Sequence, residues 1–485
     1  MRGRPLQALA AITVAGAVLR FATLGVQSYW LDEAATVNLL HKSFGSMLSG
    51  VVSGESTPPL YYVFAWLWAK VFGTGEAGLR SFSALLGTAT IPLAFVLGRR
   101  VGGATAGLIS AALCAFNPLL VWYSQEARSY ALLVLLSGLT LLSMLDVLER
   151  PTGRRLALWA AAAIAALATH YFAGFLIGGE AMWLLYRTDA RGRVAYAVGA
   201  VVLAAAALLP LALHQRSTGA AKFISASSLL RRLAESPKQF VLGYQGPLEV
   251  VLTIVSAFLV AYAVLRLLAL AHGPVRHRAF LFGGLGLAAI ALPFALAAIG
   301  PDYLITRNTL PAWLPLGVAV AVGFATPRAR WEGFIAAGLL CLIGLIVVLA
   351  VDTDERYQRD DWRSAARALG TSKVRRAVII TPVSGQIPLL LYLKGAKPVP
   401  PEGIDVMELD YVGLAPRLPG QAPRPPRPPG PLPLPGFAEI GRKEGETYTV
   451  LREQAAAPLH VTPQVGLSPL DSRAATVVYQ DPGSH

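Results

Sequence analysis

The chain has 485 residues, of which 54% are hydrophobic and 14% are charged, and its mean hydropathy is +0.53. These values exclude an ordinary soluble protein, because too few polar side chains remain to face water. The net charge is +14, yet the arginines stand in short clusters between apolar runs rather than along one basic face, which argues against a nucleic-acid surface. The composition predicts a protein that is solvated mostly by lipid.

The apolar runs predict an α-helical polytopic membrane protein with about eleven spans, since each span needs about 20 residues. The run at 173–186 is short, and we include it because its omission would break the alternation of basic loops described next. The runs cover residues 6–25, 80–98, 102–121, 130–148, 156–172, 173–186, 194–213, 249–270, 279–299, 309–325 and 332–351.

Basic residues occur in every second loop between these runs. Because cytoplasmic loops are enriched in Lys and Arg, we expect these loops and the N-terminus to face the cytoplasm, and the region after the last span to lie outside the plasma membrane. A cleaved signal peptide over 6–25 is the alternative, but no small-residue cleavage site precedes Tyr29, so we expect this span to be retained. The basic positions are Arg2, Arg4, Arg99, Arg100, Arg150, Arg154, Arg155, Arg187, Arg191, Arg193, Arg266, Arg276, Arg278, Arg328 and Arg330.

The first outer loop, residues 26–79, begins with an acidic pair behind two aromatic residues. Asp32 and Glu33 follow the first span directly, and the aromatic side chains of Tyr29 and Trp30 are expected to anchor them at the membrane boundary. A carboxylate that is half screened from water there can act as a base or bind a metal. The alternative is a solvated pair of loop acids, since adjacent acids alone are a weak signal.

Later in the same loop, residues 58–74 are apolar and rich in aromatic side chains, but Lys70 interrupts them. We expect this segment to form an interfacial helix that lies flat at the outer face, where Trp and Tyr are favoured. Counting it as a span would place Arg99 and Arg100 outside.

Three arginines are expected at the outer ends of spans, against the usual distribution of positive charge, which calls for an anionic partner. Arg80 opens the second span, Arg128 lies in the polar segment 124–130, and Arg307 opens a late span. A guanidinium can hold a phosphate through paired hydrogen bonds. Snorkelling to the interface is the alternative, and Glu126 is an alternative ion partner for Arg128.

Other polar and aromatic side chains at outer span ends are candidates for the substrate site. A lone histidine at a helix end is more often a hydrogen-bonded structural residue, and Asp302 is an ordinary candidate for the anion beside Arg307. The candidates are Tyr61, Gln125, Glu126, Tyr130, His170 and Tyr171.

These segments resemble the GT-C glycosyltransferases, in particular the superfamily of protein mannosyltransferases and lipid A aminoarabinose transferases, over roughly residues 6–370. The resemblance implies that Asp32 is the catalytic base, with Glu33 beside it, and that Arg128 contacts the donor phosphate. The matching motifs are Trp30–Ala34, Pro58–Tyr62, Leu79–Ser81, Asn117-Pro118 and Ser124–Tyr130.

Two positions depart from the family pattern. Arg307 is followed by Asn308, whereas family members often have Tyr after this arginine. Residues 56–58 read Ser-Thr-Pro, whereas the aminoarabinose enzymes have Glu-Lys-Pro. The missing lysine argues against aminoarabinose as the donor sugar.

The resemblance implies a glycosyltransferase that moves a sugar from a polyprenyl-phosphate donor in the lipid bilayer to a hydroxyl of a glycan, lipid or protein acceptor outside the cytoplasm. The residues agree, because this reaction needs a base for the acceptor and cations for the departing phosphate. A single displacement would invert the anomeric centre. No cofactor is required, a divalent cation stays open with its ligands unknown, and no nucleic acid is expected.

Two other classes of protein remain as alternatives. A lipid-linked sugar flippase or other transporter should carry ionisable residues near the bilayer midplane and paired broken helices. A non-catalytic membrane scaffold would tolerate the loss of Asp32 and Arg128.

Residues 1–351 thus form the expected membrane module, and the composition changes after them. Residues 352–413 predict a small extracytoplasmic α/β domain, and the proline-rich residues 414–436 predict an extended linker. A returning strand is expected within 437–453, and the tail 454–485 is expected to be disordered because it lacks periodicity. The predicted elements are a helix at 359–369, a strand at 376–381, a helix at 387–393 and a strand near 447–451.

Overall fold

The computed structural model divides the chain into two units. The helical unit comprises Met1–Leu24 and Leu39–Ala350, and the sheet unit comprises Gly25–Asn38 and Val351–His485. The segment that carries Asp32 and Glu33 therefore belongs to the sheet unit. The structure describes residues 3–219, 224, 227–300, 302–326, 330–413, 434–463, 468–470 and 474–483.

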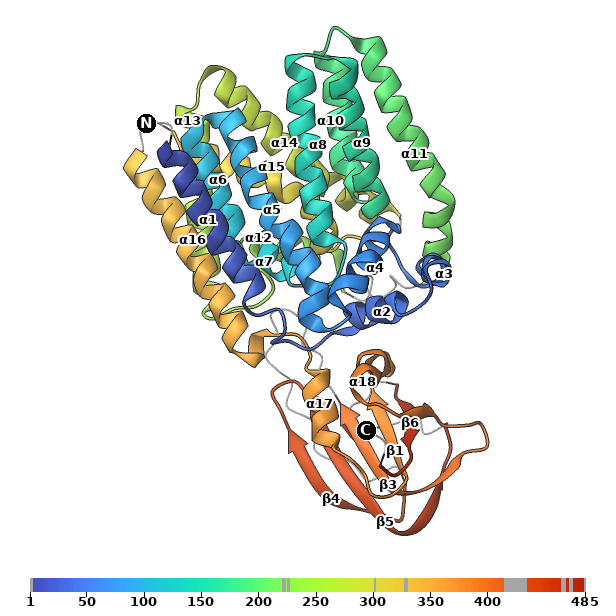
Figure 1. Cartoon of the computed structure of the whole chain (residues 1–485). Helices are drawn as coiled ribbons and strands as arrows, with labels where there is room; N and C mark the ends of the chain where they lie inside the picture. The colour runs from blue at the N-terminus through green and yellow to red at the C-terminus, as the bar shows by residue number, and fades with distance from the viewer. Residues whose placement is uncertain are drawn as a thin grey trace. The chain divides into compact units, whose positions relative to one another are not determined.

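Every predicted apolar run contains a helix, and these helices lie side by side in a bundle (Figure 1). Among the described residues, six helices are long and apolar enough to cross a membrane, or seven if α6 and α7 form one bent span. The chain is a multi-pass membrane protein, while the predicted number of about eleven spans stays a prediction. The bundle helices are α1 Gly3–Phe21, α5 Glu76–Gly102, α6 Ala104–Phe116, α7 Pro118–Ser124, α8 Tyr130–Glu149, α9 Gly153–Thr169, α10 Ala173–Arg187, α11 Arg191–Ser217, α13 Glu249–Leu270, α14 Gly273–Ile299, α15 Trp313–Phe324 and α16 Arg330–Thr353.

The short run at 173–186 does form a helix, α10, of 15 residues. Helices α9, with 17 residues, and α15, with 12 residues, are also shorter than the roughly 20 residues that cross a bilayer. The 3-10 turn η2, Thr306–Ala312, directly precedes α15 and extends it. Of these three runs, only the one at 309–325 is longer than its α-helix, because its first residues lie in η2.

A proline separates α6 from α7, and the two helices are bent by 59°. Pro118 has no N–H and would leave the carbonyl of Cys114 without its helical donor. The guanidinium of Arg20, on α1, donates to Cys114 O at 3.0 Å and to Ala115 O at 3.0 Å. The side chain of Asn117 caps α7 by accepting from Leu120 N at 3.0 Å. Arg20 is fully buried and therefore acts as a structural residue of this helix break.

A buried carboxylate links three bundle helices. Glu180, on α10, accepts hydrogen bonds from Thr140 Oγ1 on α8 and from Trp159 Nε1 on α9, each at 2.8 Å. Both carboxylate oxygens are thus hydrogen-bonded away from water, which offsets the cost of their burial. The three side chains hold α8, α9 and α10 in one register.

The basic loops meet at one end of the bundle, as their alternation predicted. Arg100, at the end of α5, pairs with Asp146 and Glu149 at the end of α8, at 2.9 and 2.8 Å. Arg278, near the start of α14, donates to the carbonyl of Arg100 at 2.9 Å. Arg328 lies outside the described residues.

Short helices occupy the loops toward the other end of the bundle. The first outer loop contains α2 Leu31–Leu40, α3 Phe44–Gly54 and α4 Leu60–Phe72, and α4 confirms the helix predicted within 58–74. The flat orientation of 58–74 stays a prediction. A further helix, α12 Leu229–Leu242, was not predicted, although its arginines and leucines form an amphipathic pattern.

The sheet unit contains a six-stranded sheet in the order β2-β6-β1-β3-β5-β4. Strands β1 and β3 are parallel, and the other pairs are antiparallel. Helices α17 Trp362–Leu369 and α18 Gln386–Tyr392 pack against the apolar side chains of one face, and a second cluster lies on the other face. The strands are β1 Arg376–Thr381, β2 Lys397–Pro398, β3 Ile404–Gly413, β4 Phe437–Glu444, β5 Thr449–Val461 and β6 Thr476–Gln480.

The predicted disorder of the tail 454–485 is wrong for the residues of the tail that the structure describes, which are 454–463, 468–470 and 474–483. Strand β5 continues to Val461, and β6 lies inside the sheet, where Val478 is opposite Val378 of β1. These strands are stabilised by partners far away in the sequence, so local periodicity carries little trace of them. The α/β domain therefore extends well beyond the predicted limit at residue 413. Of the predicted linker, residues 414–433 lie outside the described part of the chain.

Candidate active site

Arg128 forms a buried, bidentate ion pair with Glu55. Its two terminal nitrogens lie 3.0 and 2.8 Å from the two carboxylate oxygens, and both side chains are less than one-tenth exposed. The guanidinium also lies 5.7 Å from the centre of the Tyr62 ring. Glu55 is therefore an acid to which the Arg128 guanidinium binds through both terminal nitrogens. The alternative partner Glu126 stays a prediction.

A buried glutamine shapes the loop that carries Glu55. Gln215, near the end of α11, donates its amide to the carbonyls of Val51 at 2.9 Å and Thr57 at 3.1 Å. Its side-chain oxygen accepts the hydroxyl of Tyr171 at 2.8 Å. Tyr171 was predicted as a substrate residue. Its hydroxyl orients Gln215, which in turn holds the loop that carries Glu55.

Four of the predicted residues come together around the first turn of α8. The ring of Tyr130 lies 5.8 Å from the guanidinium of Arg307 and 6.0 Å from the ring of His170. Burial, and after it the positive charges of Arg307 and Arg128, lower the pKa of His170 to about 3, against a hydrogen bond with Asn308. His170 is therefore neutral at ordinary pH and can serve as a neutral hydrogen-bonding group.

Three other candidates make contacts that organise the bundle. Arg80 is buried and donates to the carbonyl of Leu24 at 2.8 Å. Gln125 donates to Leu19 O at 2.9 Å and also to the side chain of Thr23. The hydroxyl of Tyr61 lies 3.5 Å from Ser83 Oγ. Gln125 and Tyr61 thus have structural partners. The role of Arg80 at the phosphate and that of Glu126 in the substrate site stay predictions.

Asp302 pairs with an arginine that the sequence did not single out. Arg232, on α12, donates to both carboxylate oxygens of Asp302 and to the carbonyl of Leu304. This guanidinium lowers the pKa of Asp302. The pair fastens α12 to the segment that leads into η2, and η2 carries Arg307.

The acidic pair occupies the first turn of α2, in the sheet unit. Asp32 is half-buried and Glu33 is fully buried. The backbone carbonyl of Asp32 accepts the hydroxyl of Thr36 at 3.1 Å, as expected inside a helix. Carboxylates are favoured in a first helical turn, because the unpaired N–H groups there are positive. Within the described residues, no group of three or more His, Cys, Asp or Glu is placed to hold a metal ion.

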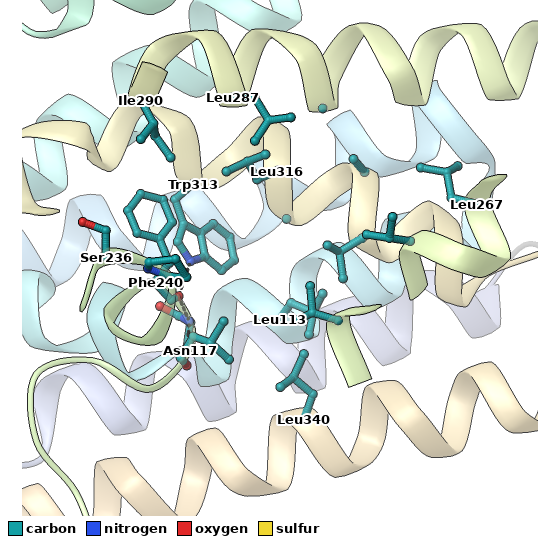
Figure 2. Close-up of a pocket in the computed structure, with 18 of the residues that line it drawn as sticks. Leu113, Asn117, Ser236, Phe240, Leu267, Leu287, Ile290, Trp313, Leu316 and Leu340 are labelled. Carbon is teal, nitrogen blue, oxygen red and sulfur yellow. Dashed lines mark hydrogen bonds between the residues drawn. The ribbon is translucent and has the colours of Figure 1, made fainter. Parts of the chain in front are cut away.

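An apolar cavity of about 760 Å³ lies inside the helical unit. α12 to α16 and the break between α6 and α7 enclose it, and apolar side chains such as Leu113, Leu267 and Leu316 form most of its wall (Figure 2). Its polar side chains include Asn117 and Ser236, which lie together near Phe240 (Figure 2).

The polar end of the cavity adjoins the segment that carries Arg307. Ser236 Oγ lies 3.2 Å from Thr306 Oγ1, and Thr306 precedes Arg307 in the chain. Trp313 Nε1 and Asn117 Nδ2 both donate to the carbonyl of Phe240, at 3.1 and 2.9 Å. The cavity thus extends from an apolar interior to the segment that carries Arg307.

Glu55, Gln215, Arg20 and Arg232 are the contributors that sequence reasoning missed. A signal existed for two of them, since Glu55 lies just before the Pro58-Pro59 motif and Gln215 lies at the outer end of a predicted span. No such signal existed for Arg20, whose partners are backbone carbonyls of another helix.

Comparisons with known proteins find a matching family model, a curated relative and similar structures. Residues 56–214 match the family model of the dolichyl-phosphate-mannose-protein mannosyltransferases. An uncharacterized protein of Aquifex aeolicus (strain VF5) is 38% identical over 93 residues, which cover 18% of this chain and 18% of that protein. This match therefore spans less than a fifth of that relative.

Two crystal structures of ArnT from Cupriavidus metallidurans resemble this chain. The structure bound to undecaprenyl phosphate has a TM-score of 0.56 at 13% identity and covers 91% of this chain and 97% of its own. The structure in the apo state has a TM-score of 0.49 at 17% identity, covering 74% and 69%. The chain thus shares its fold with the ArnT structure bound to undecaprenyl phosphate, and a segment in its first half matches the mannosyltransferase family model.

Proposed function

We propose that the chain is an inverting glycosyltransferase that transfers a sugar from a polyprenyl-phosphate donor to an acceptor hydroxyl at the extracytoplasmic face of the membrane. The observation that carries this proposal is the apolar cavity, whose polar end adjoins the segment of Arg307. Such a site suits a molecule with a long apolar tail and an anionic head. The similarity to a structure of ArnT bound to undecaprenyl phosphate supports the same class of donor.

The cavity would receive part of the isoprenoid tail. Its wall is made almost entirely of aliphatic and aromatic side chains (Figure 2), and burying apolar surface is favourable by about 25 cal/mol per Å². Ser236 and Asn117 would then face the tail where it approaches the phosphate. This arrangement would direct the donor with its tail along the helices and its phosphate toward η2.

Arg307 and Arg128 would stabilise the phosphate as it leaves. Glu55 accepts two N–H bonds from Arg128 and so orients the guanidinium. The neutral ring of His170 lies beside Tyr130 in the same cluster and adds a hydrogen-bonding group without adding charge. Cations in a buried site act more strongly on a developing anion than they would in water.

Asp32 would act as the base. The acceptor oxygen forms a bond to the anomeric carbon, the bond from that carbon to the phosphate oxygen breaks, and the proton of the acceptor passes to the Asp32 carboxylate. The other product is the polyprenyl phosphate. A single displacement of this kind inverts the anomeric centre and requires no second nucleophilic carboxylate, so Glu33 would orient the loop. The step as written requires no cofactor, and a divalent cation stays possible.

We also propose that the N-terminus is cytoplasmic and that the sheet unit is extracytoplasmic. The basic loops share one end of the bundle, and cytoplasmic loops are the ones enriched in Arg and Lys. The candidate site, with Arg128 and Arg307, belongs to the ends of the helices that are remote from those loops.

A transporter is the second class to weigh, because Glu180 is an ionisable residue within a bundle helix. Its two oxygens accept from Thr140 and Trp159, so its burial has a structural explanation. We therefore favour transfer over transport.

The test is incubation of the purified chain with a panel of radiolabelled polyprenyl-phosphate sugars and candidate acceptors. We expect label to leave the donor and appear in an acceptor product, with the unlabelled polyprenyl phosphate released in equal amount. The Asp32→Asn chain is the matched control. Absence of transfer with every donor, together with movement of intact donor across vesicles, would favour the transporter instead.

A further inference from the structure

The segment that precedes Asp32 is fastened to the C-terminal part of the sheet unit. Residues 25–29 contact residues 359–363 and Tyr392, more than three hundred positions later in the chain. The proposed catalytic carboxylate follows this fastened segment by only three residues. The geometry of the carboxylate therefore depends on a domain that is remote in sequence.

The start of α17 forms the first part of this contact. Ser28 Oγ donates to the carbonyl of Asp360 at 3.0 Å and accepts the backbone N–H of Trp362 at 3.1 Å. The side chain of Gln27 accepts the backbone N–H of Arg359 at 3.0 Å. Ser28, Gln27 and Trp362 are all buried, so water competes little for these hydrogen bonds.

The side chain of Arg363 holds the same segment through further hydrogen bonds. Arg363, one residue into α17, donates to the carbonyl of Gly25 at 3.1 Å and to the carbonyl of Val26. These are backbone acceptors, so the arginine fixes the path of the chain rather than a particular side chain. The segment 25–28 is thereby held along its length.

The contact closest to the carboxylate is made by Tyr392 at the end of α18. Its hydroxyl accepts the backbone N–H of Tyr29 at 2.8 Å, and Tyr29 itself is buried. The next residue, Trp30, is the residue whose carbonyl accepts the N–H of Ala34 at 2.9 Å and so opens α2. Fixing Tyr29 therefore fixes the entry of α2, on whose first turn Asp32 lies.

We infer that the C-terminal domain positions the base, and that Tyr392 is a positioning residue acting through Asp32. The inference rests on the proposed function, because it takes Asp32 to be the base. A displacement of a reacting group by about 1 Å is enough to cost about 10²-fold in rate. The sheet unit is then part of the catalytic apparatus although it contributes only Asp32 to the chemistry.

The test compares Tyr392→Phe with Tyr479→Phe in the full-length chain. Tyr479 lies on β6, and the same hydroxyl is removed there from the same domain. We expect Tyr392→Phe to lower kcat about tenfold and to leave the KM for the donor within about twofold, because the donor site is untouched. Ser28→Ala should act in the same direction, and Tyr479→Phe should leave both constants unchanged.

Two further measurements separate positioning from a general loss of structure. In an Asp32→Asn background, Tyr392→Phe should cause no additional loss, because it acts through the carboxylate that is already gone. Hydrogen exchange of the peptide 25–38 should become at least threefold faster in Tyr392→Phe and stay unchanged in Tyr479→Phe. This second readout does not depend on activity.

The outcomes distinguish the two proposals. If Asp32→Asn retains full turnover, the assignment of the base fails, while faster exchange in Tyr392→Phe still supports the fastening of its segment. If Asp32→Asn is impaired but Tyr392→Phe transfers normally, or if the two losses multiply in the double variant, the positioning role is overturned.

Discussion

At the scale of single residues, the reaction depends on one carboxylate that can take a proton. Replacing Asp32 by Asn keeps the shape of the side chain but removes its basicity. We expect Asp32→Asn to fold and to bind donor while transfer falls by about 10²-fold or more, the usual scale for loss of a general base. Initial rates at saturating donor and acceptor measure this effect.

Two further expectations help to interpret the result with Asp32→Asn. Glu33→Gln should be milder, because Glu33 is buried and would orient the loop rather than accept the proton. The pKa of His170 is lowered to about 3, so this ring should contribute no acid limb to the pH profile near neutrality. Normal turnover in intact Asp32→Asn would move the search for the base to Glu33 or Glu126.

Arg128 is the second residue with a measurable role. Arg128→Ala should weaken binding of a polyprenyl-phosphate by about 1.5–3 kcal/mol, as for the loss of a charged hydrogen bond. The variant also leaves Glu55 buried without its ion partner, which would destabilise the fold by about 3–5 kcal/mol. Donor binding by isothermal titration is therefore best measured in the double variant Arg128→Ala/Glu55→Ala.

A matched variant isolates the contribution of Arg128 to the donor. Glu55→Gln keeps the arginine and most of the shape of the pair, so its donor affinity should stay within about threefold of the parent on the scale of one hydrogen bond. If the double variant binds donor as tightly as the parent, Arg128 serves the loop alone and the phosphate must be held elsewhere.

At the scale of helices and strands, the carboxylate between α8, α9 and α10 offers a stability prediction. Glu180→Leu removes the acceptor of both Thr140 and Trp159 and should lower the free energy of unfolding by about 1–3 kcal/mol. Glu180→Gln keeps one acceptor oxygen, so its loss should be smaller. Thermal unfolding in detergent compares the two.

The same pair of variants also tests the transporter reading. Glu180→Gln should retain sugar transfer, because the side chain supports helix packing and lies outside the proposed reaction. If Glu180→Gln folds but does not transfer sugar, the ionisable carboxylate of Glu180 is itself needed. That result would favour a transporter, in which a buried ionisable group takes part in the cycle.

The elements that sequence predicts best are those whose cause is local. Each apolar run became a helix, and strand β1 was placed at residues 376–381 as the structure has it, because hydropathy and β-branched residues mark these segments. Strand β6 was missed because its partners are β1 and β2, which no short window contains. The same reason hid Arg20, whose acceptors exist only because Pro118 breaks a neighbouring helix.

The residues of the candidate site also divide into those that the sequence marks locally and those that it does not. The acidic pair and three arginines stood out because they break the expected composition of outer span ends. Glu55, which grips Arg128, and Gln215, which shapes its loop, could not be paired with their partners from the sequence. Gln215 joins α11 to α3 and to the loop before α4, and Glu55 joins that loop to the segment before α8. Only the packing of the bundle brings these segments together.

At the scale of the whole molecule, the mechanism requires a defined orientation in the membrane. Single cysteines in a chain whose own Cys114 and Cys341 are replaced should report it through an impermeant thiol reagent applied to intact cells. Ser217, at the end of α11, and Thr353, at the end of α16, are exposed and should react from outside. Thr188 is buried, so its exposed neighbour Asp189 is the better site between α10 and α11, and it should react only after permeabilisation.

This pattern follows from the charges, because Asp189 lies between Arg187 and Arg191 in a basic loop that the positive-inside tendency keeps in the cytoplasm. Labelling of all three cysteines after solubilisation is the control for their reactivity. The reverse pattern, with Asp189→Cys reacting from outside and Ser217→Cys protected, would place the ends that carry Arg128 and Arg307 in the cytoplasm. A transfer reaction on the outer face would then be ruled out, even if the residues of the site were assigned correctly.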